Sequence, residues 1–143
     1  MSIDWSAAAA PSLDEFEALA VAALESLPQP FRDLCKDVRC YVTDFAENDV
    51  LDELEIESEF DLMGLFTGVG MAQEGIVPTG RMPNTVHLYR RPILDYWAEH
   101  EETLGAVVTH VLIHEMGHHF GFSDEDMEAL EEQAAREAGN NHD

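Results

Sequence analysis

Two histidines four residues apart, His114 and His118, restrict the structures open to this 143-residue chain because they interrupt an otherwise apolar stretch. Residues four apart on an α-helix lie one above the other on the same face. Burying two imidazoles without partners would cost several kcal/mol. We therefore expect a long apolar helix over residues 101–120 in which both imidazoles converge on one metal ion, at about 2.0–2.1 Å each.

Glu115 follows the first of these histidines and lies about 100° around the helix from it. This offset places its carboxylate beside the ion and not on it, where it can hold a water molecule and act as a general base. A catalytic zinc site takes three protein ligands and keeps one position open. The two histidines therefore need a third ligand from another part of the chain.

Gly121 can adopt the left-handed conformation that ends a helix and reverses the chain. Such a bend returns Asp124 toward the histidines, so the string from His114 to Asp124 contains two nitrogen ligands, a base, a turn and an oxygen ligand. Ser123 is also a good helix N-cap with Asp126 as its capping-box partner, and acids in the first turn alone would explain Asp124. If Asp124 serves only the helix terminus, four glutamates of the last helix are the alternative third ligands: Glu128, Glu131, Glu132 and Glu137.

Four further side chains near this string have both a structural and a functional interpretation. His110 lies one turn before His114 but about 12 Å along the helix axis from His118. We therefore expect it to pack in the core or to support a metal ligand. His119 should point away from its neighbour and lie partly exposed. His87 and Tyr89 share one face of a predicted strand and are candidates to polarise a carbonyl, although structural packing is the simpler interpretation.

Apolar periodicity and turn residues divide the chain into helices and strands, and its length fits one domain over residues 1–143. We expect a core of about residues 12–138, a disordered tail over 139–143, and a third strand that Pro92 ends. The acidic segment 44–61 should be a solvated surface, with Arg90 and Arg91 as its charge partners. The expected helices cover residues 12–27, 48–54, 93–99, 101–120 and 124–138, and the expected strands cover residues 38–45, 62–69 and 85–90.

Thirty Asp and Glu residues against seven Lys and Arg give the chain a formal charge of −23. This charge repels phosphate backbones and anionic lipid, so we expect no nucleic-acid partner. No apolar run approaches the ~18 residues of a membrane span, so no membrane is expected either. The first residues lack the basic and leucine-rich parts of a secretion signal. We interpret Cys35 and Cys40 as small hydrophobic residues in a reduced state. Together these features predict a cytoplasmic protein.

The sequence resembles the small zincins, predicted zinc metallopeptidases of the Asp-zincin type, in which an aspartate replaces the third histidine of metzincins. Residues 57–66, 85–96 and 114–127 carry the likeness, which covers about the last two-thirds of the chain. It implies an α+β, minimal zincin-like domain with a small mixed β-sheet packed on the active-site helix and flanking helices. It also implies that His114, His118 and Asp124 bind Zn²⁺ and that Glu115 is the general base for hydrolysis of a peptide or protein substrate.

The sequence departs from related zincins in two respects. Metzincins carry a methionine turn below the metal, whereas Met127 falls inside the predicted last helix. Larger zincins add a C-terminal subdomain that forms the far wall of the cleft, so we expect a shallow cleft here, or one completed by a homodimer. An extended peptide would add to residues 62–69 as an edge strand. The alternative is a non-catalytic zincin-fold binding or structural protein with a weak or vestigial metal site.

Overall fold

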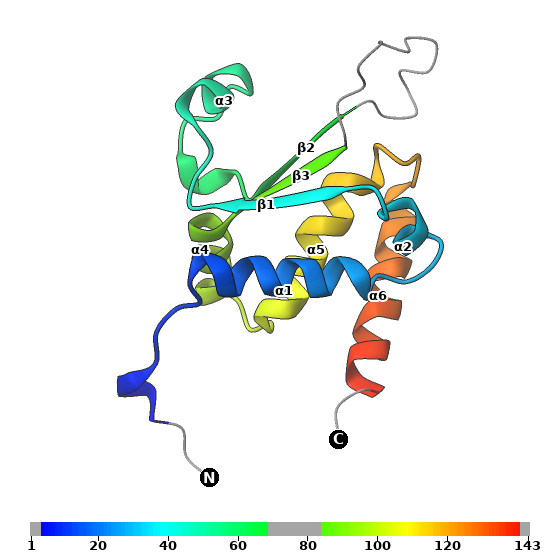
Figure 1. Cartoon of the computed structure of the whole chain (residues 1–143), viewed down its shortest axis with the longest axis horizontal. Coiled ribbons are helices and arrows are strands. Elements are labelled where there is room, and N and C mark those ends of the chain that lie inside the picture. Colours follow the sequence, from blue (N-terminus) through cyan, green and yellow to red (C-terminus); the bar gives the residue numbers. More distant parts are fainter. Residues whose placement is uncertain (1–3, 69–83, 141–143) are drawn as a thin grey trace.

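The computed structural model describes residues 4–68 and 84–140 and has the expected α+β architecture, a small mixed sheet with helices around it (Figure 1). The described helices are η1 (Trp5–Ala7), α1 (Leu13–Glu25), α2 (Phe31–Leu34), α3 (Asn48–Glu53), η2 (Glu59–Asp61), α4 (Arg90–Glu99), α5 (Leu104–Gly117) and α6 (Asp124–Asn140). The described strands are β1 (Arg39–Thr43), β2 (Gly64–Thr67) and β3 (Thr85–Tyr89).

The described strands form one sheet in the order β1-β3-β2. β1 runs parallel to β3, with Tyr41 opposite His87, and β2 runs antiparallel to β3, with Leu65 opposite the same residue. Among the described strands, β2 therefore lies at an edge of the sheet, as predicted, although it is shorter than the expected 62–69. Residues 69–83, which connect β2 to β3, lie outside the described part of the chain.

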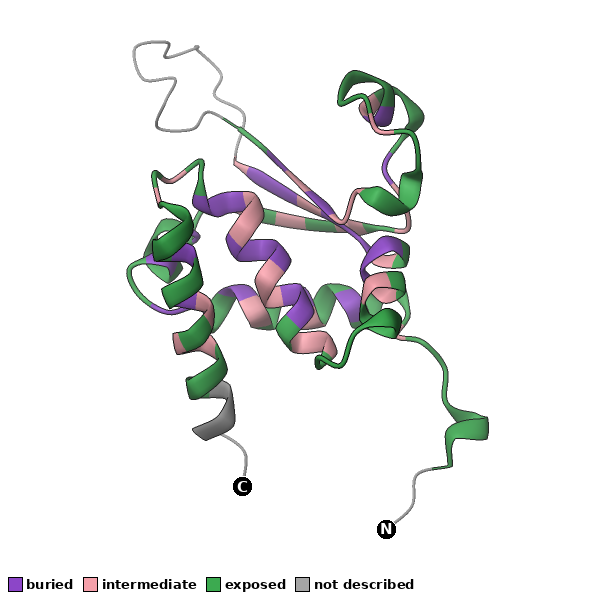
Figure 2. Ribbon diagram, turned by 180° about the vertical axis from the view of Figure 1, so that it is seen from behind, coloured by how far each residue is buried: buried purple, intermediate pink, exposed green. Residues whose placement is uncertain are grey.

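Helix α5 is the centre of the fold. It contacts α1, α4, α6, β2 and β3, and α1 and α5 lie on the same side of the sheet (Figure 1). Buried residues recur along the whole of α5 (Figure 2). Burying one such aliphatic or aromatic side chain contributes about 1.5–3 kcal/mol. The largest fully buried side chains are Phe16, Leu27, Phe31, Val86, Leu88, Ile93, Val107, Val108, Leu112, Ile113, Met116 and Met127.

A second, smaller cluster lies where α3 meets the end of β3. It consists of Ala46, Leu51 and Tyr89, all less than a tenth exposed. Near it, Arg90 donates from Nη1 to Asp44 Oδ1 at 3.1 Å, and Arg91 Nε lies 3.9 Å from the same oxygen. The predicted pairing of the two arginines with the acidic segment is thus confirmed.

The end of the first helix, the presence of α2 and the end of the third strand differ from the sequence prediction. α1 begins after Ser12, which forms a capping box with Glu15, but it ends at Glu25 and not at residue 27. α2 was not predicted. The prediction that Pro92 ends the third strand was wrong, because β3 ends at Tyr89 and Pro92 lies in the first turn of α4, where a missing N–H breaks no helical hydrogen bond.

The last helix is longer than expected. α6 continues to Asn140, whereas the helix was expected to end at residue 138. A glycine inside a helix costs only about 1 kcal/mol relative to alanine, which a continuing hydrogen-bond ladder tolerates. Residues 141–143 of the predicted tail lie outside the described part of the chain.

Candidate metal centre

Helix α5 presents the motif at its C-terminal end. Thr103 caps its start, because the side-chain oxygen accepts a hydrogen bond from the Ala106 N–H at 3.2 Å. This cap and the turn after Gly117 make the helix shorter than the expected 101–120. One side of α5 faces the core. His114 and His118 lie outside this buried side, so His114 is half-buried and His118 is exposed.

The chain reverses after α5 as the sequence predicted. Gly121 has φ +87°, and its N–H donates to the carbonyl of His118 at 3.1 Å. The N–H of Phe122 donates to the carbonyl of Gly117 at 3.0 Å. These two bonds form a Schellman motif, in which a glycine in the left-handed region ends the helix.

The bend brings Asp124, the first residue of α6, next to His118. Asp124 Oδ1 lies 3.3 Å from His118 Nε2, and the side chains are 88% and 64% exposed. Ser123 and Asp126 form the reciprocal cap expected for α6, with both hydrogen bonds at 3.1 Å. The helix cap therefore uses Asp126, and Asp124 remains beside the imidazole.

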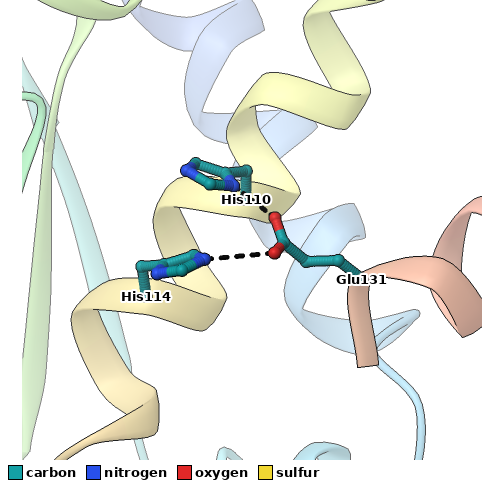
Figure 3. A group of neighbouring side chains, drawn as sticks. All are labelled: His110, His114 and Glu131. Carbon is teal, nitrogen blue, oxygen red and sulfur yellow. Dashed lines mark hydrogen bonds and ion pairs between the residues drawn. The ribbon is translucent and has the colours of Figure 1, made fainter. Parts of the chain in front are cut away.

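His114 faces a different carboxylate. Its Nε2 lies 3.1 Å from Glu131 Oε2 on α6, and Glu131 Oε1 contacts His110 Nδ1 (Figure 3). The two imidazole rings are 4.2 Å apart between centroids. Among the described residues, His110, His114 and Glu131 are the group whose ligand atoms all lie within 4.8 Å of one another, so the predicted set through Asp124 is not gathered this closely.

Glu131 was one of four alternative ligands in the sequence, whereas His110 was assigned to packing or support of a ligand. Two features of the sequence point weakly to this group of three side chains. His110 precedes His114 by one helical turn, and Glu131 follows the buried Leu130 on α6. Sequence alone does not say which glutamate of α6 faces α5.

Glu115 lies on the side of α5 that faces the sheet. A Cβ added to Gly64 of β2 would meet Glu115 Cγ at 3.1 Å, so the two backbones approach closely here because Gly64 has no side chain. Burial raises the pKa of Glu115 to about 7, and the charge of His114 opposes this rise. Near neutral pH this carboxyl can therefore both lose and regain a proton.

The other aromatic and histidine candidates serve mainly in packing. His119 is exposed, and the centroid of its ring lies 4.5 Å from that of the Phe66 ring. His87 stacks on Tyr41 with centroids 5.8 Å apart. Tyr89 is 4% exposed, and burial, with the charges of Glu115 and Glu47, raises its pKa. These contacts agree with the structural interpretation of His87 and Tyr89.

A helix carrying the histidine motif beneath a small mixed sheet defines a zincin-like protein. The family model of zincin-like metallopeptidases matches residues 35–134, and the chain belongs to this family. The match includes the sheet, α5 and most of α6. No curated protein matches the chain at a significant level. Among the described helices, none has the length and apolar character needed to span a membrane.

Membership of this family implies a metal ion, typically zinc. The side chains at the end of α5 fit that expectation in their chemistry. His114 and His118 each direct a ring nitrogen at a carboxylate oxygen, at 3.1 and 3.3 Å. Imidazole nitrogen and carboxylate oxygen are ligands that zinc takes in proteins.

Proposed function

We propose that this chain is a zinc-dependent peptidase in which His114, His118 and Asp124 bind the ion and Glu115 is the general base. The family and the position of Asp124 beside His118 support this ligand set. When bound, zinc polarises a scissile carbonyl and lowers the pKa of its water.

The observation that carries the proposal is the environment of Glu115. Its carboxyl follows a candidate zinc ligand in sequence and lies against the sheet, and in the metal-free protein burial raises its pKa to about 7. The charge of a zinc ion beside it would favour the ionised carboxylate, which is the form that a general base needs. Glu115 would therefore take a proton from the attacking water and return it to the leaving amine.

The substrate we propose is an extended peptide that adds to β2. β2 pairs with β3 on one side only within the described part of the sheet, so its other edge offers free backbone groups. Gly64 of β2 adjoins Glu115. A peptide along this edge would pass beside the proposed base.

Glu115→Gln tests the proposed role of this residue. The variant should keep about one equivalent of zinc and lose peptide hydrolysis by about 10²-fold or more, because an amide cannot accept the proton. Cleavage of a mixed peptide library, followed by mass spectrometry, measures the loss. Glu99→Gln, which changes an exposed glutamate at the end of α4 that is not a candidate ligand, is the matched control and should keep wild-type activity. Unchanged turnover in Glu115→Gln would exclude Glu115 as the base.

One observation favours the alternative, a non-catalytic zincin-fold binding or structural protein. His114 faces Glu131 and not Asp124, so the proposed catalytic ligands are not gathered around one point. Elemental analysis and zinc titration of the purified protein come first. Zinc bound at about one equivalent, without cleavage anywhere in the library, would favour the alternative.

Compartment and assembly are also proposals. Burial raises the pKa of Cys35 to about 12 and that of Cys40 to about 11, so both free thiols stay protonated, as suits a reducing cytoplasm. A homodimer would add a second wall to the site, and sedimentation of the zinc-loaded protein tests for it.

A further inference from the structure

Three side chains at the contact between α5 and α6 converge on one point, and only His114 among them belongs to the set proposed for catalysis. His110 and His114 come from successive turns of α5, and Glu131 reaches them from α6 (Figure 3). Each oxygen of the Glu131 carboxylate contacts one imidazole, through His110 Nδ1 and His114 Nε2. We call this group the α5/α6 cluster.

The packing of the two helices fixes the position of Glu131. Met127 is fully buried one turn before it, and Leu130 is 7% exposed. Gly117 allows the close approach of α6, because a Cβ there would lie 2.2 Å from Met127 Sδ. The carboxylate is thus held opposite the imidazoles by the core and not by its own contacts alone.

The α5/α6 cluster is also accessible. The side chains of His110, His114 and Glu131 are 42%, 38% and 24% exposed. A carboxylate oxygen accepts hydrogen bonds, so each ring directs an N–H at it in the metal-free protein. A divalent ion that displaced these two protons would gain two nitrogen ligands and one oxygen ligand without refolding of the chain.

We propose that His110, His114 and Glu131 form a second binding site for a divalent transition metal. Two imidazoles and a carboxylate favour zinc, cobalt or nickel over magnesium and calcium, which prefer oxygen ligands. His114 belongs to both this site and the set with His118 and Asp124. Its Nε2 can bind one ion at a time, so the two sets compete for His114 and cannot both be filled through this nitrogen.

The competition has a functional consequence. An ion in the α5/α6 cluster occupies His114 from the α6 side, whereas Glu115 faces the sheet. The cluster would therefore hold metal in a form that Glu115 does not serve. Metal binding at the α5/α6 cluster does not depend on whether the chain hydrolyses peptides.

Metal titration without substrate tests the proposal. The double variant His118→Ala/Asp124→Asn removes the exposed ligands of the other set and keeps the α5/α6 cluster. It should still bind about one equivalent of zinc in competition with a chromophoric chelator. Adding Glu131→Gln should weaken binding by more than the roughly 10–100-fold that loss of a supporting contact costs. Adding Glu99→Gln instead, which removes the same charge from an exposed position at the end of α4, should leave the affinity unchanged.

Two results would overturn the proposal: loss of zinc binding in the double variant, or equal affinity of the Glu131→Gln and Glu99→Gln variants. His110→Ala in the same background gives a second, independent loss. Circular dichroism confirms folding of each variant, which is expected because the substituted side chains are at least partly exposed. Since no turnover is measured, a failure of the peptidase proposal would leave this result unaffected.

Discussion

Neighbouring residues of α5 meet different partners because each step along a helix turns by about 100°. Glu115 faces the sheet at Gly64, while His114 faces Glu131 on α6. Burial raises the pKa of the first carboxyl, whereas the second is shared between two imidazoles. Two adjacent positions of α5 thus place the proposed base and a proposed metal ligand on different sides of the helix.

The raised pKa of Glu115 predicts how the stability of the metal-free protein depends on pH. A glutamate ordinarily titrates near 4.5, but in the folded protein this carboxyl keeps its proton until about pH 7. Between these pH values the folded state binds more protons than the unfolded state, so this group's contribution to stability falls as pH rises. Glu115→Gln removes the titration, and its stability advantage over the wild type should grow across this window and then level off.

Chemical denaturation of both proteins in the presence of a chelator measures this difference at closely spaced pH values. Titration of groups that do not interact with Glu115 cancels in the comparison, because the two chains differ at one residue. A stability difference that does not change between pH 4.5 and 7 would contradict the raised pKa.

At the scale of elements, the helices with strong caps or long periodicity could be predicted from the sequence. α1 starts after Ser12, and α6 starts at Asp124, each as expected from its capping residues. α2 has four residues, which is too short for a 3.6-residue period to be detected. Arg90 was assigned to a strand, since the sequence does not show that the chain turns into α4 directly after Tyr89.

Some parts of the candidate site could likewise be predicted from the sequence, and others could not. The bend after α5 could be predicted because Gly121 is the residue that suits a left-handed helix end. The partner of His114 could not be, because it depends on how α6 crosses α5. That crossing is set by the contact between Met127 and Gly117, which the sequence pattern does not reveal.

The contact between Met127 and Gly117 predicts that replacing this glycine by alanine will lower the stability of the protein. Replacing glycine by alanine in a helix normally stabilises by about 0.5–1 kcal/mol. At Gly117 the new Cβ would lie 2.2 Å from Met127 Sδ and 2.8 Å from its Cγ, inside the core. We therefore expect Gly117→Ala to destabilise the protein by about 1–3 kcal/mol, as measured by urea denaturation.

Gly105→Ala, in the first turn of the same helix, is the control. No atom lies within 4 Å of a Cβ added there, so this substitution should be neutral or stabilise by up to about 1 kcal/mol. Equal effects at the two positions would show that Met127 does not restrict Gly117.

At the scale of the whole molecule, charge is the dominant feature. Seven Lys and Arg cannot neutralise thirty Asp and Glu, so the folded chain carries a formal charge of −23 at pH 7. Both Arg90 and Arg91 lie at a single acidic residue, Asp44, which leaves still fewer cations for the other carboxylates. Like charges on a compact molecule repel one another and lower its stability.

Salt should therefore stabilise this protein. The screening length falls from about 10 Å at 0.1 M to about 3 Å at 1 M, which weakens repulsion between surface carboxylates more than it weakens short ion pairs. In sodium chloride at pH 7, the Tm of the chelator-treated protein should rise by several degrees, since 1 kcal/mol corresponds to about 3–5 °C for a chain of this size. Near pH 4.3, where the net charge approaches zero, the same salt should raise Tm little or not at all. An equal rise at both pH values would show that salt acts through general exclusion from the protein surface and not through its charge.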